Sequence, residues 1–174
     1  MAEEEEDTGT RIRHPNREKS SSQVTKAFVA LLLVASAVLV GLVTIGGWAV
    51  LQGAYVLSAL YIIVYLIMAY FVMRWSRGVL PMAAAFGIGL AVFALIAAPA
   101  WFDRAAPNYA EPAIPPRLLG TLTILTAIVQ LILVVAAMIA FQQKWNLELE
   151  ESVDEDDRGG QQGYGGGQAQ PAGA

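Results

Sequence analysis

The chain has 174 residues, 56% of them hydrophobic, with 11 lysines and arginines against 15 acidic residues and a net charge of −4. The charged residues fall into a few islands instead of being spread along the chain, which is not the pattern of a soluble domain. Because the sequence contains no cysteine, it excludes a disulfide bond and a thiolate metal site.

The N-terminal segment, residues 1–26, is rich in charge. It opens with EEEED and continues with RIRHPNREK, which contains the single histidine, His14. Segments of clustered charge bury too little apolar surface to offset the entropy of the chain. We therefore expect residues 1–26 to form a disordered tail.

Three long stretches then carry no charge, namely residues 27–73, 78–102 and 118–143. Crossing the hydrocarbon core takes about 20 apolar residues in a helix that satisfies its own backbone. The first stretch is long enough for two crossings, with a turn at Gln52 and Gly53. The sequence thus predicts an all-α integral membrane protein with a domain at 27–141, a bundle of four transmembrane helices at 27–51, 54–73, 80–100 and 118–141.

The distribution of lysine and arginine predicts how the chain is threaded, because these residues resist translocation. The candidate outer loop contains only Arg104 and Arg117. The remaining basic residues next to the spans are Arg11, Arg13, Arg17, Lys19, Lys26, Arg74, Arg77 and Lys144. We expect a multi-pass protein of the cell membrane with both termini cytoplasmic.

Tryptophan provides a second indication of the span ends, since its amphipathic ring favours the headgroup layer. Each tryptophan falls at a predicted helix end, and we expect all of them to be interface anchors: Trp48, Trp75, Trp101 and Trp145.

Small residues repeat at helical spacing on two spans. On the third span they are Ala83, Gly87, Ala91, Ala94 and Ala98, and on the first they include Ala37 and Gly41. Small residues let helix backbones approach closely in lipid, so these faces predict tight helix packing. The alternative is a hinge or a pore wall.

Polar residues share faces on the other two spans: Ser58, Tyr61 and Tyr65 on the second, and Thr123, Thr126 and Gln130 on the fourth. Gln130 lies near the middle of its span, where an amide without a partner costs several kcal/mol. We expect it to point into the bundle and to bond across helices, with a solute path as the alternative.

The predicted outer loop, residues 101–117, contains Pro107, Pro112, Pro115 and Pro116. Proline forbids a continuous helix there, so we interpret the loop as a surface cap that can also present a docking face. Its carboxylates, Asp103 and Glu111, are a weak signal for a site and are expected to be solvated.

The C-terminal segment, residues 142–174, is acidic and then rich in glycine and glutamine, which predicts a second disordered tail. The acidic residues are Glu148, Glu150, Glu151, Asp154, Glu155, Asp156 and Asp157. This block has three possible roles: binding a basic cytoplasmic partner, binding the chain's own segment 11–26, or only keeping the chain soluble.

No Asp, Glu, Lys, Arg or His falls inside a predicted span, which argues against a proton-driven transporter. No nucleotide, zinc or nucleic-acid motif is present, so we expect no enzyme, cofactor, metal or nucleic-acid partner. The hypothesis is an accessory or scaffold subunit without catalytic activity, in contact with the lipid bilayer and with other membrane subunits or further copies. The alternative is a subunit of an oligomeric channel or transporter for a neutral or small solute. A lipid-modifying enzyme is a third, weaker possibility.

Overall fold

The structure is a computed structural model that describes residues 10–13, 19–51, 53–106, 111–145 and 149–152. It divides into two compact units, Asn16–Asn146 and a smaller one built from Met1–Pro15 and Leu147–Ala174.

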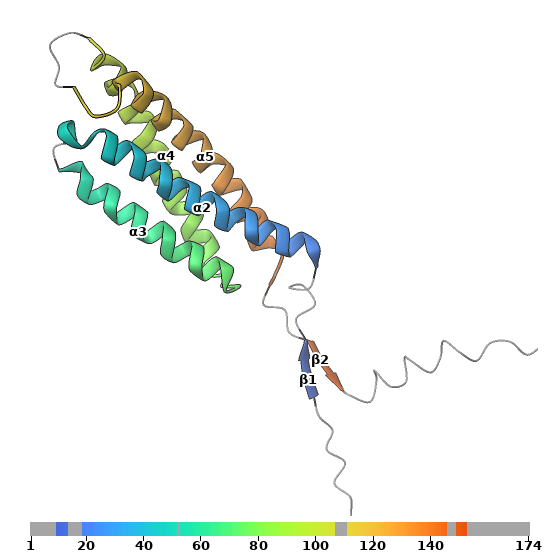
Figure 1. Ribbon diagram of the computed structural model, residues 1–174. Coiled ribbons are helices and arrows are strands. Elements are labelled where there is room, and N and C mark those ends of the chain that lie inside the picture. The colour runs from blue at the N-terminus through green and yellow to red at the C-terminus, as the bar shows by residue number, and fades with distance from the viewer. Residues whose placement is uncertain (1–9, 14–18, 52, 107–110, 146–148, 153–174) are drawn as a thin grey trace, which may run out of the picture. The chain divides into compact units, whose positions relative to one another are not determined.

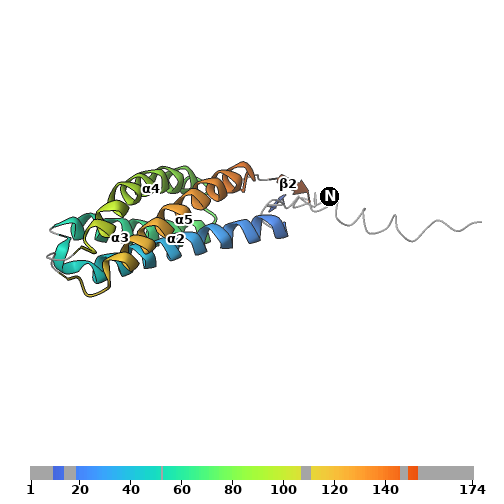
Figure 2. The same cartoon turned by 90° about the horizontal axis from the view of Figure 1, so that it is seen from above.

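The larger unit is an all-helical bundle (Figure 1). Among the described residues, four helices are long and apolar enough to cross a membrane, as the charge-free stretches predicted: α2 (Ser20–Gly46), α3 (Ala54–Met73), α4 (Val79–Asp103) and α5 (Pro116–Gln142). Helix α4 packs along α5, and α2 packs against both α3 and α5 (Figure 2). The backbones of α3 and α4 lie farther apart, and side chains such as Tyr61, which packs edge to face on Phe86, make the contact between them. One side of the bundle is therefore loosely closed.

Helix α2 does not have the predicted bounds of 27–51. It begins at Ser20, where Lys19 is extended (φ −64°, ψ 128°) and its carbonyl accepts the backbone N–H of Ser22 at 3.0 Å. The prediction that residues 20–26 are disordered is therefore wrong. The helix continues beyond the N-terminal end of the apolar stretch, because a single charged residue, Lys26, does not stop a helix. The helix ends at Gly46, and a short 3₁₀ turn, η1 (Trp48–Val50), follows.

Helix α3 begins and ends where the sequence predicted. The turn before it uses Gly53 at φ +93°, a left-handed conformation that glycine adopts without a steric penalty. Gln52, the other residue of the predicted turn, lies outside the described residues.

Helices α4 and α5 extend beyond their predicted bounds of 80–100 and 118–141. Helix α4 continues through Pro99 to Asp103, so the predicted loop 101–117 begins one turn too early. Contacts hold this last turn in place, because Trp101 lies against Gly47 and Phe102 against Gly120. Helix α5 starts at Pro116, whose missing N–H and fixed φ suit the first helical position.

The smaller unit contains a two-stranded antiparallel sheet of β1 (Thr10–Arg13) and β2 (Leu149–Ser152). The expectation that both tails are disordered is therefore wrong for these residues. The register places Arg11 opposite Glu151 and Arg13 opposite Leu149. The other tail residues outside the helices, apart from 19 and 143–145, lie beyond the described part of the chain.

The core of the bundle is apolar, and so is most of its outer surface. Leu33, Leu80 and Leu133 are fully buried, while Ile45 and Ile96 are among many large apolar side chains that face outward. Large exposed apolar surface on every helix suits a bundle surrounded by lipid and is unusual for a protein in water.

Candidate functional site

A hydrogen-bond network lies at the centre of the bundle. Gln130 on α5 is fully buried, and its Oε1 accepts a hydrogen bond from the Tyr65 hydroxyl of α3 at 2.8 Å. Its Nε2 donates to Oγ of Ser36 on α2, also at 2.8 Å. Ser36 in turn donates to the carbonyl of Leu32 at 2.7 Å. One amide thus joins three helices near their midpoints, in the place where the sequence led us to expect Gln130.

Ser36 was missed by sequence reasoning. It is a single hydroxyl in an otherwise apolar span, and serine also satisfies itself on its own helix, as its bond to Leu32 shows. The signal that could have found it is its position near the middle of its span, level with Gln130 on the last span.

The other polar candidates behave differently from Gln130. Thr123 and Thr126 are buried, but their hydroxyls donate to the carbonyls of Leu119 and Leu122 on the same helix, each at 2.8 Å. Ser58 donates in the same way to Ala54 at 3.2 Å. These hydroxyls do not join helices to each other.

The small residues of α4 face the interior. Ala83, Gly87, Ala91, Ala94 and Ala98 are all buried. At Gly87 a β-carbon would lie 3.2 Å from Cγ2 of Val134 and 3.7 Å from the Gln130 carbonyl oxygen, so α4 meets α5 closely there.

On α2, the predicted small face is used only in part. Ala37 is buried at 5% exposure, whereas Gly41 is half-buried, and the nearest atom to its would-be β-carbon is Cδ1 of Ile62 at 3.9 Å.

Two tryptophans do not meet the expectation of interface anchors. Trp145 is fully buried and Trp101 is 6% exposed, so protein encloses both rings. A position at a helix end does not decide whether a ring turns toward lipid or toward the core. Trp48 is 59% exposed and stacks on Tyr55, and Trp75 is half-buried.

The two ends of the chain segment that forms the bundle meet in an aromatic clamp. The rings of Trp75 and Trp145 pack edge to face with centroids 5.3 Å apart, and Nζ of Lys26 lies 4.0 Å from the centre of a Trp75 ring. The indole N–H of Trp145 donates to Gln143 at 3.0 Å, and Gln143 donates to Thr25 at 3.0 Å. The clamp therefore connects the start of α2, the α3–α4 turn and the end of α5.

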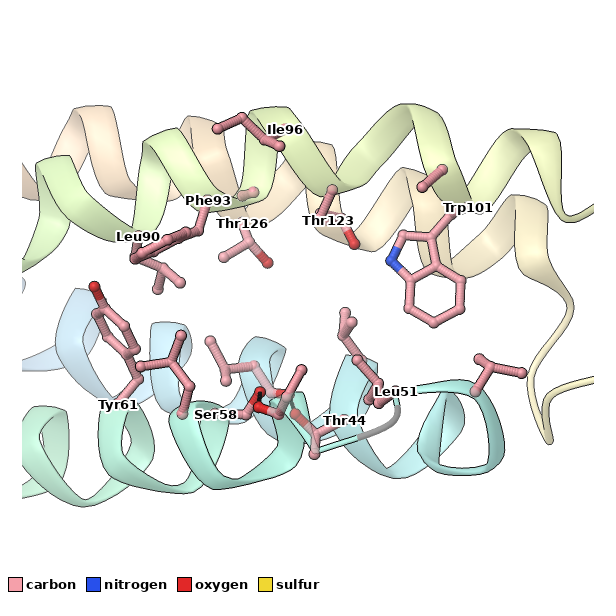
Figure 3. A pocket seen from close by; sticks show the side chains of 18 of the residues that line it. Thr44, Leu51, Ser58, Tyr61, Leu90, Phe93, Ile96, Trp101, Thr123 and Thr126 are labelled. Atoms are coloured by element: carbon pink, nitrogen blue, oxygen red, sulfur yellow. Dashed lines mark hydrogen bonds between the residues drawn. The ribbon is translucent and has the colours of Figure 1, made fainter.

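At the opposite end, a pocket of about 450 Å³ lies where α3 and α4 diverge (Figure 3). Its wall is mostly apolar, with Leu57, Leu90 and Phe93 among the lining residues. Its polar groups come from residues Thr44, Ser58, Tyr61, Trp101, Arg104, Thr123 and Thr126. The volume is in the range of small-molecule sites, roughly 300–1,000 Å³.

The carboxylates of the predicted loop are not part of this wall. Asp103 and Glu111 are both exposed and are absent from the residues that line the pocket. Within the described residues, no three His, Cys, Asp or Glu side chains form a group that could hold a metal. What the pocket offers chemically is apolar contact, hydroxyl oxygens, the indole N–H of Trp101 and one guanidinium.

No protein-family model, curated protein or solved structure matches this chain.

Proposed function

We propose that this chain is a small multi-pass membrane protein that acts by association, as an accessory or scaffold subunit without catalytic activity. The observation that carries the proposal is the Ser36–Gln130–Tyr65 network, in which the buried polar groups bond to one another. A bundle that uses its intramembrane polar groups to hold its own helices together leaves its surfaces, loops and tails for function.

The alternative, a subunit of an oligomeric channel or transporter, has weaker support. A path between subunits needs polar or small faces that point outward, toward another copy. The small face of α4 is buried in this chain, and so are Thr123, Thr126 and Gln130.

We place the protein in the cell membrane with both termini cytoplasmic. Lys26 and Arg77 belong to the clamp end of the bundle, whereas Arg104 and Arg117 belong to the loop end, where Asp103 and Glu111 offset them in number. Lysine and arginine in short segments favour the cytoplasmic side.

Cysteine labelling tests this threading, because the native chain has no cysteine. In sealed cells, Ala106→Cys is expected to react with an impermeant thiol reagent, and Ala2→Cys or Ala174→Cys to react only after permeabilisation. Reaction of either terminal variant in sealed cells would contradict the proposed orientation.

The tails provide a second test. In this proposal the acidic C-terminal segment binds a partner protein in competition with the chain's own β1. We expect proteins that co-purify with the full chain in gentle detergent to be lost from a chain ending at Leu147. Addition of about 0.5 M salt should release the same proteins, because salt screens contacts between exposed charges.

A chain lacking residues 2–15 is the matched control for that experiment. Because it removes the internal competitor of the acidic segment, it should retain the co-purifying proteins or recover more of them. If the truncation after Leu147 still inserts and leaves the set of recovered proteins unchanged at low salt, the acidic segment has no part in association.

A further inference from the structure

The pocket at the loop end opens sideways, between α3 and α4. The backbones of these two helices lie farther apart than those of the other packed pairs, and the Tyr61 ring bridges to Phe86 and Phe93 at the deep end of the pocket. Exposed lining residues such as Ile96 and Ala97 lie at its border, so it is accessible from the outer surface of the bundle. In a membrane, the molecules that reach such an opening are lipids.

Two buried donors line this pocket without a hydrogen-bond partner among the described residues. Trp101 is 6% exposed and Tyr61 is 8% exposed, and neither the indole N–H nor the phenolic hydroxyl bonds to another described group. Figure 3 shows Tyr61 at one end of the pocket and Trp101 at the other. The indole nitrogen lies on the side of its ring that faces Tyr61, whereas the Tyr61 hydroxyl points away from Trp101. Unsatisfied buried donors are uncommon and indicate a missing acceptor.

The threonine hydroxyls of the wall are already used as donors within the protein. Thr44, Thr123 and Thr126 already give their hydroxyl hydrogens to carbonyls of their own helices, at 2.7 to 2.8 Å. The pocket therefore presents an N–H donor near its loop end, and apolar surface that runs from there to the Tyr61 ring at its deep end.

Arg104 supplies a positive charge at the rim. It is half-exposed, and its guanidinium forms no salt bridge or hydrogen bond with another described residue. It follows Trp101 by three residues, which places both on one side of α4 and roughly 4.5 Å apart along the axis. A guanidinium next to an N–H donor suits the oxygens of a phosphate and of the ester below it.

The length of the pocket suits one lipid chain. Leu90 and Arg104 are both lining residues, and 14 residues of helix span roughly 21 Å. One leaflet provides about half of the roughly 30 Å hydrocarbon core. An acyl chain that starts at the rim can therefore run the length of its leaflet inside this groove.

We propose that the groove between α3 and α4 binds one anionic phospholipid, with an acyl chain between Trp101 and Tyr61 and the phosphate on Arg104. A lipid with a net negative headgroup is favoured over a zwitterionic one because Arg104 carries the only charge among the lining residues that the structure identifies. This site is separate from the tails, so it does not depend on the proposed association.

Fluorescence quenching by brominated lipid tests the proposal on the full chain. The protein is reconstituted in phosphatidylcholine vesicles that contain an equal small fraction of either dibrominated phosphatidylglycerol or dibrominated phosphatidylcholine. Bromine quenches tryptophan on contact, and Trp101 lies in the pocket wall. We expect the phosphatidylglycerol to quench at about fivefold lower concentration, the ratio that one arginine contributes near an anionic surface.

Two pairs of variants identify the residues that cause a preference for phosphatidylglycerol over phosphatidylcholine. Arg104→Gln should abolish the preference, while Arg117→Gln, which removes an exposed arginine at the same end but outside the pocket wall, should keep it. Ala97→Phe, which adds a ring to the pocket border, should weaken quenching by both lipids, and Ala85→Phe, exposed elsewhere on α4, should not.

The proposal is overturned if the two lipids quench the native chain equally, since the headgroup is then not recognised. It is also overturned if Arg117→Gln removes the preference as fully as Arg104→Gln, or if Ala97→Phe leaves quenching unchanged. Helix content from circular dichroism confirms that each variant is folded before it is compared.

Discussion

Replacing Trp145 with alanine is expected to destabilise the bundle by about 3–5 kcal/mol, the range for removing a large buried aromatic side chain. Trp145 is fully buried, packs on Trp75 and donates to Gln143. Its loss leaves a cavity and removes one of the contacts that hold Gln143 toward Thr25. Thermal unfolding in detergent, followed by circular dichroism, measures the effect.

Trp48→Ala is the matched control, because Trp48 is 59% exposed and contacts Tyr55 on the bundle surface. It removes the same number of atoms with little loss of buried contact. Equal unfolding temperatures for the two variants would mean that Trp145 does not anchor the end of α5.

Gly87→Leu is expected to cost about 1–3 kcal/mol, the usual penalty for overfilling a packed interior. A β-carbon at Gly87 already lies 3.2 Å from Val134, and the longer side chain must push α4 away from α5. That movement also strains the neighbouring Gln130, whose carbonyl oxygen lies 3.7 Å from the same β-carbon. The measurement is again the unfolding temperature in detergent.

Ala85→Leu controls for the change of residue type, since Ala85 is exposed on the same helix. It should leave the unfolding temperature nearly unchanged, because its new side chain faces outward. A loss of stability in Ala85→Leu as large as that in Gly87→Leu would refute the close approach of α4 and α5 as the cause.

The helices were predictable because the membrane imposes a simple rule on the sequence. A stretch without charge and of sufficient length forms a helix, and this rule located all four helices, with both ends of α3 in place. It placed the start of α2 and the end of α4 less well. Those ends depend on residues outside the charge-free stretches and on contacts such as Trp101 with Gly47.

The sequence predicted that the interior contains a hydrogen-bonded polar group, but it did not predict all of that group's partners or which aromatic rings are buried. A glutamine in mid-span has to find a partner, and this physical necessity led to Gln130 without revealing Ser36 as one of its two partners. The burial of Trp101 and Trp145 could not be predicted from their places at helix ends, because it depends on how neighbouring helices cross. The pocket depends on the divergence of α3 from α4, a tertiary feature with no local signal.

The pairing of β1 with β2 has a consequence for the order in which the chain assembles. One strand precedes the first helix and the other follows the last, so the sheet cannot form until the ribosome has made every helix between them. In an unfolded chain, closing so long a loop carries a large entropic cost. The bundle removes most of this cost, because the bond from Gln143 to Thr25 brings the start of α2 and the end of α5 together. Few residues of sequence then lie between each strand and the neighbouring helix, so we expect the sheet to close after the four helices have assembled.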